Sequence, residues 1–303
     1  MESACANPRE PGRAHAPRAI LRTRILILTS LAMFAFAGNS LLCRMALKHT
    51  TIDPATFTSV RLLAGAIALW LIARVRAGSR VRSGNWSSAL ALFCYAAGFS
   101  FAYVDLSAGT GALLLFGSVQ ATMILFGLWK GERMTGWQGI GLAAALGGLV
   151  AMLLPGLSAP PLRSALLMMV AGMAWGAYSL RGKGAGDPLA TTAGNFLRSV
   201  PFAVILSLLL ATMARADAQG IAYAVLSGAL TSGVGYAIWY AAVRGLKASN
   251  AATVQLSVPV ISAIGGVLML GEPITLRLMG ASIAVLGGIA LVVLNPGADS
   301  RTS

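Results

Sequence analysis

The sequence has few charged residues and few of the side chains that carry chemistry in soluble enzymes. Charged residues make up 11% of its 303 residues, against 57% hydrophobic residues, and its two histidines are His15 and His49. The three cysteines, Cys5, Cys43 and Cys94, are odd in number and lack the spacing of metal ligands or of a disulfide framework. We therefore expect no metal site, no disulfide bond and no cofactor.

Acidic residues are scarce, and none lies in the middle of an apolar stretch. The nine acids are Glu2, Glu10, Asp53, Asp105, Glu132, Asp187, Asp217, Glu272 and Asp299. A proton-coupled transporter normally has a titratable group at membrane depth, and a membrane-embedded enzyme needs a nucleophile with a base, or metal ligands, there. The sequence also lacks a His-Glu-x-x-His motif and a phosphate-binding loop. Both classes are disfavoured, with Asp105 as the one candidate for proton coupling.

Apolar stretches fill most of the chain, and each is close to the roughly 20 residues that cross a bilayer as a helix. Turn-forming residues such as Asp53-Pro54 and Gly271-Glu272-Pro273 separate them. A backbone exposed to lipid has to satisfy its own hydrogen bonds, which favours helices. The predicted fold is an all-α polytopic membrane protein with ten transmembrane helices, near residues 25–43, 55–74, 86–104, 109–129, 135–154, 162–180, 189–213, 219–243, 250–270 and 274–294.

Lysine and arginine residues fall mostly on one side of these predicted helices. The N-terminal stretch carries five arginines between Arg9 and Arg24, and the connection from Arg74 to Arg82 carries four. The positive-inside rule then places both termini in the cytoplasm. We expect a disordered cytoplasmic tail at 1–24 and a cytoplasmic C-terminal tail at 298–303. Because the net charge of +14 is spread between apolar stretches, the expected partner is the lipid bilayer and not nucleic acid.

The second half of the chain repeats part of the first. Gly131-Glu132 matches Gly271-Glu272 at an offset of 140 residues, and a Leu-Gly-Gly step recurs at the same offset. This divides the membrane part into a first repeat at 25–156 and a second at 157–297. Five helices per repeat is an odd number, so the second repeat should cross the membrane in the opposite direction. Such inverted repeats imply a pseudo-two-fold axis in the membrane plane and a site between the halves, as in transporters.

Several short motifs carry a family resemblance over residues 25–297. They are Leu270-Gly271-Glu272-Pro273, Trp175-Gly176, Ser257-Val258-Pro259 and Arg61. With ten predicted helices in two halves, the chain resembles the EamA-type branch of the drug/metabolite transporter superfamily, and the stretch 174–188 is most similar to the YddG-type amino acid exporters. The resemblance implies an exporter in the inner membrane of a bacterial cell. The first half departs from the family pattern, with Phe36-Ala37-Gly38-Asn39 in place of a Trp-Gly step.

Polar and aromatic side chains occur at helical spacing on several predicted helices, as a cavity for a small polar solute requires. The candidates for substrate binding are Asn39, Tyr95, Phe99, Gln120, Trp175, Tyr178, Tyr236, Trp239, Gln255 and Ser257. Aromatic rings would stack on a planar or apolar side chain and attract an ammonium group. The alternatives are packing within the bundle, an interfacial aromatic belt for Trp239, and interhelical hydrogen bonding for Gln120 and Gln255.

Two arginines and two glycine faces have more than one interpretation. Arg61 and Arg198 lie a turn or two inside the second and seventh predicted helices. A cation there can bind a substrate carboxylate, but it more often snorkels or holds a neighbouring helix end, so we leave both outside the predicted site. The faces containing Gly148 and Gly288 serve packing within a monomer, which we expect, or a dimer seam. Glu272 is expected to be structural.

The leading hypothesis is an exporter of amino acids with aromatic and other apolar side chains. It would work by alternating access between the two halves, and by facilitated diffusion because no buried acid is available for proton coupling. The alternative within transport is another small metabolite, such as a nucleotide sugar or phosphate ester, or a drug. A purely structural or receptor protein would require a large soluble domain, and the predicted connections are too short to hold one.

Overall fold

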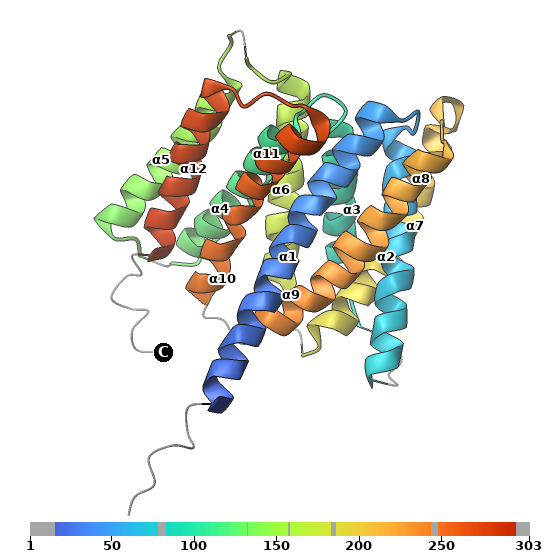
Figure 1. The fold of residues 1–303 in the computed structure, drawn as a ribbon, viewed down its shortest axis with the longest axis horizontal. Helices are drawn as coiled ribbons and strands as arrows, with labels where there is room; N and C mark the ends of the chain where they lie inside the picture. Colours follow the sequence, from blue (N-terminus) through green and yellow to red (C-terminus); the bar gives the residue numbers. More distant parts are fainter. Residues whose placement is uncertain are drawn as a thin grey trace, which may run out of the picture.

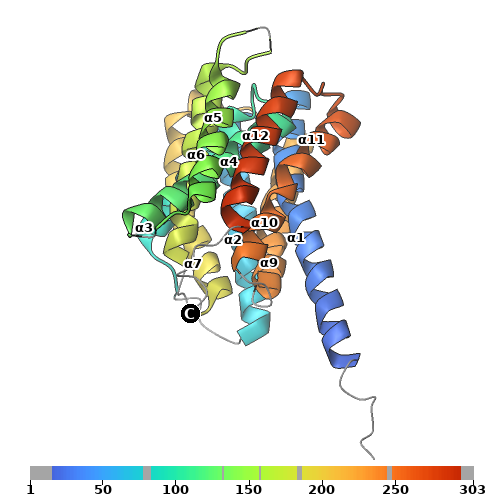
Figure 2. The same ribbon diagram turned by 90° about the vertical axis from the view of Figure 1, so that its left-hand side faces the viewer.

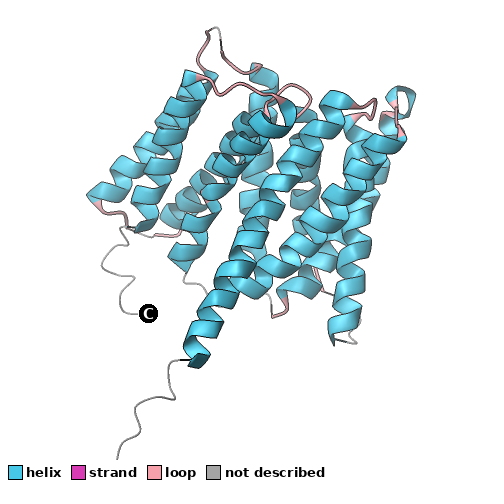
Figure 3. Cartoon of the chain, in the orientation of Figure 1, coloured by secondary structure: helices cyan, strands magenta, loops and turns pink. Residues whose placement is uncertain are grey.

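All the regular structure in the described part of the chain is helical (Figure 3). The computed structural model describes residues 16–77, 83–131, 133–156, 158–182, 186–243 and 248–294. Within these ranges eight helices are long and apolar enough to cross a membrane, in agreement with the predicted class. The elements are α1 (Ala16–His49), α2 (Pro54–Ala77), α3 (Trp86–Ala102), α4 (Ala108–Trp129), α5 (Gly136–Leu153), α6 (Leu162–Gly182), α7 (Pro188–Leu209), the 3₁₀ turn η1 (Ala211–Met213), α8 (Ala218–Val225), the π-helix η2 (Leu226–Val234), α9 (Gly235–Val243), α10 (Ala248–Gln255), α11 (Ser257–Leu270) and α12 (Leu276–Leu294).

Every predicted apolar stretch overlaps a described helix, but three details differ. The first helix begins at Ala16, so the last part of the expected tail is helical, while residues 1–15 and 295–303 lie outside the described residues. The π-helix η2 interrupts the helix expected over 219–243. The helix expected over 250–270 breaks at Leu256, between α10 and α11. Both interruptions contribute residues to the cavity described below.

Side chains at the helix starts explain where several helices begin. The first N–H groups of a helix have no partner within the helix, and a short polar side chain just before it can accept their hydrogen bonds. Asn85, Ser107 and Asp217 do this for α3, α4 and α8, and Asp187 does so before a proline in α7. Thr135 forms a reciprocal capping box at α5. The turns between apolar stretches therefore act as helix starts.

Asp53 links the start of α2 to the segment before α8. Its Oδ1 accepts hydrogen bonds from the N–H groups of Ala55 and Thr56, and its Oδ2 accepts one from the N–H of Arg215. Partial burial works to raise the pKa of Asp53, but the bonds from Thr56, Arg215 and Ala55 outweigh it and hold that pKa below its ordinary value of 3.8. The ionised carboxylate is therefore favoured in the folded protein.

This gives a prediction for stability at acid pH. A lowered carboxylate pKa contributes stability that is present above the unfolded pKa and is lost as pH falls through the folded one. We expect the thermal stability of the wild type in detergent to exceed that of Asp53→Asn at pH 6, and the difference to shrink as pH falls below about 4. Asparagine is a good helix cap, so it is the matched variant. A difference that stays constant between pH 6 and pH 3 would contradict this role.

The two halves of the chain pack across each other. α2 lies against α7, α4 against α11, and α5 against α12, while α3 packs on α6 and α1 packs on α8, η2 and α9. The contact of α3 with α6 in this list is equivalent to the contact of α1 with α8 to α9, if α1 corresponds to α6 and α3 corresponds to α8 to α9. The other three contacts each join a helix of the first half to its counterpart in the second half. Figures 1 and 2 both show α5 and α12 side by side, and in Figure 1 this pair forms the left edge of the bundle while α1 crosses its middle.

The α5–α12 contact depends on small residues. A Cβ atom added at Gly288 would lie 2.4 Å from the carbonyl oxygen of Gly141 and 2.7 Å from the nitrogen of Ala145, and one added at Gly148 would lie 2.9 Å from the Cβ of Ala284. The neighbouring Gly287 has no atom within 4 Å of such a Cβ. The small faces are thus used for packing inside the chain, which was the simpler of the two predicted uses.

Alanine substitutions at these adjacent glycines should have opposite effects. Gly288→Ala forces backbone against backbone, and overpacking of this kind costs about 1–3 kcal/mol. Gly287→Ala meets no atom and gains helix propensity, so it should be neutral or slightly stabilising. The melting temperatures of the two purified variants in the same detergent provide the measurement. Equal destabilisation by both substitutions would contradict the described packing.

Candidate functional site

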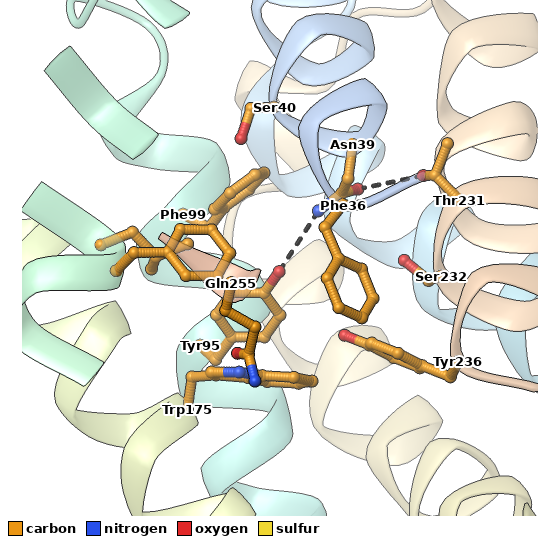
Figure 4. A pocket seen from close by; sticks show the side chains of 12 residues that line it. Phe36, Asn39, Ser40, Tyr95, Phe99, Trp175, Thr231, Ser232, Tyr236 and Gln255 are labelled. Carbon is orange, nitrogen blue, oxygen red and sulfur yellow. Dashed lines mark hydrogen bonds between the residues drawn. The ribbon is translucent and has the colours of Figure 1, made fainter. Parts of the chain in front are cut away.

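A narrow cavity lies at the centre of the bundle, lined by helices of both halves (Figure 4). Its water-accessible volume is about 20 Å³, which is room for about one water molecule. The helices therefore have to move apart before a solute of the size of an amino acid can enter. Six of the predicted substrate-binding residues line this central cavity: Asn39, Tyr95, Phe99, Trp175, Tyr236 and Gln255.

Aromatic rings from three helices form one side of the cavity. Trp175 stacks on Tyr236 of α9, with ring centroids 5.3 Å apart and an interplanar angle of 20°, and on Tyr178 at the same distance and 28°. Tyr95 of α3 lies 4.8 Å from Trp175 in a tilted arrangement and 5.5 Å from Phe99. Trp175 is therefore the centre of a connected aromatic cluster, and Figure 4 shows its ring beside that of Tyr236.

Asn39 holds the polar side of the cavity together. Its Nδ2 donates a 3.2 Å hydrogen bond to the hydroxyl oxygen of Tyr95, and its Oδ1 accepts from Ser227 at 2.7 Å and from Thr231 at 3.5 Å. These bonds join α1 to α3 and to η2. Asn39 is buried, and its amide is expensive to leave unpaired at this depth, so the network fixes the relative positions of three helices around the cavity.

Arg61 is the largest difference between prediction and structure at this site. Its side chain is 1% exposed and does not snorkel to an interface. Nη2 donates a 2.9 Å hydrogen bond to the Tyr95 hydroxyl, and the guanidinium carbon lies 5.1 Å and 4.8 Å from the ring centroids of Tyr95 and Phe99. By contrast, Arg198 contacts a neighbouring segment, which is one of the two uses expected for it: its Nη1 donates to the carbonyl oxygen of Ser83, and also to that of Gly194 in its own helix.

Four predicted site residues lie outside the cavity lining. Tyr178 stacks behind Trp175 and bonds to Thr192 and Asn195, while Trp239 packs edge-on against Phe36. Ser257 donates to the carbonyl oxygen of Val254 at the break in its helix. Gln120 is buried in α4 at 5% exposure. The structure therefore does not bring these four residues together with the six that line the cavity.

Six lining residues were absent from the sequence-based set. They are Phe36, Ser40, Leu115, Phe116, Thr231 and Ser232. The last two belong to η2, where the backbone packs so tightly on α2 that a Cβ at Gly228 would lie 2.1 Å from the carbonyl oxygen of Arg61. Such π-helical segments are rare and often mark functional sites. The signal in the sequence was that the residues over 227–233 are all small or polar except Leu230, within an otherwise apolar stretch.

The break between α10 and α11 lies beside the cavity. Leu256 interrupts the helix, and Pro259 follows as a residue without an N–H group to donate. Gln255, the last residue of α10, lines the cavity and donates weakly back to Ala251 at 3.4 Å. Discontinuous helices at membrane depth are typical of transporter binding sites, because the freed backbone groups can serve a ligand.

An ion pair lies at the end of the bundle where α1 ends. Arg44 Nε lies 2.8 Å from Glu272 Oε1, while Glu272 Oε2 accepts a 2.7 Å bond from the N–H of Ala108. Arg44 also donates to the carbonyl oxygens of Tyr103 and Val104. Gly271, just before the acid, has a φ of 62° and ends α11 in a left-handed conformation that favours glycine. The expected structural role of Glu272 fits these contacts, which join α1, α3, α4 and α11.

The described residues form an all-helical membrane protein with a central cavity that polar and aromatic side chains from both halves of the chain line. The model of the EamA-like transporter family matches residues 23–154 and again residues 162–294. The chain therefore belongs to the EamA-like transporter family. This agrees with the predicted class of membrane transporter.

Individual relatives add information at different levels. An uncharacterised protein of Pseudomonas aeruginosa is 58% identical over 271 residues, covering 89% of this chain and 94% of that protein. A probable terminal-alkyne amino-acid exporter of Streptantibioticus cattleyicolor is 29% identical over 191 residues, covering 61% of this chain and 64% of that protein. A solved crystal structure matches with a TM-score of 0.63 at 15% identity, covering 90% of this chain and 98% of that one, which concerns the fold alone.

Proposed function

We propose that this protein exports amino acids with aromatic and other apolar side chains across the bacterial inner membrane by alternating access. The observation that carries the proposal is the central cavity, where a cluster of aromatic rings faces a small polar network. Membership of the EamA-like transporter family and the distant relative named as an amino-acid exporter support it. An aromatic side chain would stack on Trp175, and the ring faces would attract the ammonium group.

The proposed architecture is ten transmembrane helices in two inverted repeats, with both termini in the cytoplasm and the protein acting as a monomer. The contact pattern supports this architecture, because each helix contact described above has an equivalent when the two halves of the chain are exchanged. The positive-inside distribution supports the orientation. Use of the small-residue faces between α5 and α12 leaves them unavailable as a dimer seam.

Transport is proposed to run by facilitated diffusion or exchange. The residues that line the cavity include asparagine, glutamine, serine, threonine and tyrosine side chains but no carboxylate and no histidine among the described residues. A titratable group in the cavity would be the simplest means of coupling flux to protons. Asp105, the one acid considered for that role, accepts a 2.5 Å hydrogen bond from Ser164 near one end of the bundle, away from the cavity lining.

The test is counterflow into liposomes that contain the purified protein and an excess of unlabelled phenylalanine. We expect saturable uptake of labelled phenylalanine that tryptophan and leucine inhibit, that a nucleotide sugar and a cationic dye do not inhibit, and that an imposed pH gradient leaves unchanged. Dye movement driven only by the gradient, without amino acid counterflow, would overturn both the substrate and the coupling. Saturable transport of the nucleotide sugar alone would make the protein a carrier of another metabolite.

A further inference from the structure

Arg61 places a positive charge beside the central cavity without an opposing negative charge. Two of its three side-chain nitrogens, Nε and Nη1, are buried and have no hydrogen-bond partner. The described residues give it no ion-pair partner either, since the ion pair found among them joins Arg44 and Glu272 at the end of the bundle. An unpaired buried charge is costly at membrane depth, and residues of this kind generally serve a ligand or a transport path.

The hydroxyl group of Tyr95 connects this charge to the cavity. Its oxygen accepts hydrogen bonds from Arg61 Nη2 at 2.9 Å and from Asn39 Nδ2 at 3.2 Å. Both bonds use lone pairs, so the hydroxyl hydrogen remains to be donated, and no acceptor for it is found among the described residues. Tyr95 lines the cavity, and Figure 4 shows its hydroxyl directed toward Asn39 at the cavity wall. An anion in the cavity would accept this hydrogen bond and lie close to the guanidinium group.

We propose that the Arg61 guanidinium and the Tyr95 hydroxyl form the binding site for the carboxylate group of the substrate. This inference deepens the proposed function, on which it rests for the identity of the substrate. A zwitterionic amino acid bound in this way supplies the missing negative charge, and a hydrogen bond between charged groups is stronger than a neutral one. Its ammonium group and side chain are then left to the faces of Trp175 and Tyr236, which stack on each other along the cavity.

Competition assays with paired ligands test the carboxylate site. Phenylalanine and phenylalaninamide differ in the carboxylate, so the ratio of their half-inhibitory concentrations in counterflow reports its contribution. We expect the wild type to prefer phenylalanine by about tenfold or more, because hydrogen bonds to charged groups contribute at that level. Arg61→Met should bring the ratio close to 1, Arg61→Lys should keep part of the preference, and Tyr95→Phe should lower it while retaining the ring.

The matched control is Arg198→Met, because Arg198 is a half-buried arginine of α7 whose hydrogen bonds within the described ranges go to carbonyl oxygens away from the cavity. It should leave the preference unchanged. An unchanged ratio in Arg61→Lys and Tyr95→Phe would overturn the proposal, even if Arg61→Met failed to fold. The proposal would also be overturned if the wild type accepted phenylalaninamide as well as phenylalanine and its transport required chloride. The anion that binds Arg61 would then be chloride and not the substrate carboxylate.

A second measurement separates this inference from the proposed function. The carboxylate 3-phenylpropionate should raise the melting temperature of the detergent-solubilised wild type and of Arg198→Met, but not that of Arg61→Met or Tyr95→Phe. Such stabilisation in a protein that does not transport phenylalanine would uphold the carboxylate site and refute the amino acid exporter. Phenylalanine counterflow together with equal stabilisation of all four proteins would uphold the exporter and refute the site.

Discussion

Alanine at Trp175 should lower phenylalanine counterflow at limiting substrate by about tenfold or more. The indole ring stacks on both Tyr178 and Tyr236 and contacts Tyr95, so its removal eliminates the centre of the aromatic cluster. The substrate side chain loses its stacking surface at the same time. Initial rates at several phenylalanine concentrations, normalised to the amount of folded protein in the liposomes, give kcat/KM for wild type and variant.

Two further variants separate loss of binding from loss of folding. Trp175→Phe keeps an aromatic ring and should retain most of the activity. Trp86→Ala removes a tryptophan that is 58% exposed and touches Phe202 by its edge, so it should change kcat/KM by less than about twofold. If Trp175→Ala reduced phenylalanine and leucine transport only in proportion to the folded fraction, with their ratio unchanged, Trp175 would be a packing residue and not part of the binding surface.

Removal of the Glu272 carboxylate should have the largest effect on stability. Its side chain and that of Arg44 are 7% and 12% exposed, and truncating one partner of a buried ion pair costs about 3–5 kcal/mol because the other charge remains. Glu272→Ala also leaves the N–H of Ala108 without its acceptor at the start of α4. We expect a large decrease in melting temperature in detergent and a loosening of the end of the bundle where α1 ends.

The ion pair can be isolated by a double-mutant cycle. Arg44→Met with Glu272→Gln removes both charges, so the double variant should be more stable than the sum of the two single effects implies. The control is Asp217→Asn, a helix cap of α8 whose oxygen accepts one bond from Gly220; asparagine caps nearly as well, so the change should be small. Additive losses in the cycle would mean that Arg44 and Glu272 do not stabilise each other.

The positions of the helices could be predicted because membrane helices are local objects. Each apolar stretch has the length of a bilayer span, and the residues that start the helices, such as Asn85, Thr135 and Asp187, precede them in sequence. The Leu270-Gly271-Glu272 turn was recognisable for the same reason, since the left-handed Gly271 depends only on its own backbone. The π-helix could not be predicted in this way, because its packing on α2 is a tertiary contact.

The site could be predicted only in part, because the sequence does not show which face of each helix points into the cavity. In a soluble protein the polar face of a helix points to water, but here both the lipid-facing and the buried faces are apolar. Spacing therefore placed Tyr95 and Phe99 on one face correctly, yet it could not show that Ser257 turns toward Val254 or that Phe36 enters the cavity. Arg61 was judged by the frequent behaviour of membrane arginines, whereas its burial depends on rings from α3.

Protection of a cavity cysteine by substrate would test most directly whether the central cavity is the transport site. Cys5, Cys43 and Cys94 are first replaced, and Ser232→Cys is then introduced into this background. Ser232 lies in the cavity lining, and its hydroxyl has no hydrogen-bond partner among the described residues. The control is Ser262→Cys, which is equally buried but does not line the cavity. We predict that phenylalanine slows the reaction of a small thiol reagent with the Ser232→Cys variant. The half-maximal effect should occur at the phenylalanine concentration that half-saturates counterflow, and the Ser262→Cys variant should react at the same rate with and without phenylalanine. Labelling at 232 that is indifferent to saturating phenylalanine would contradict a substrate site in this cavity.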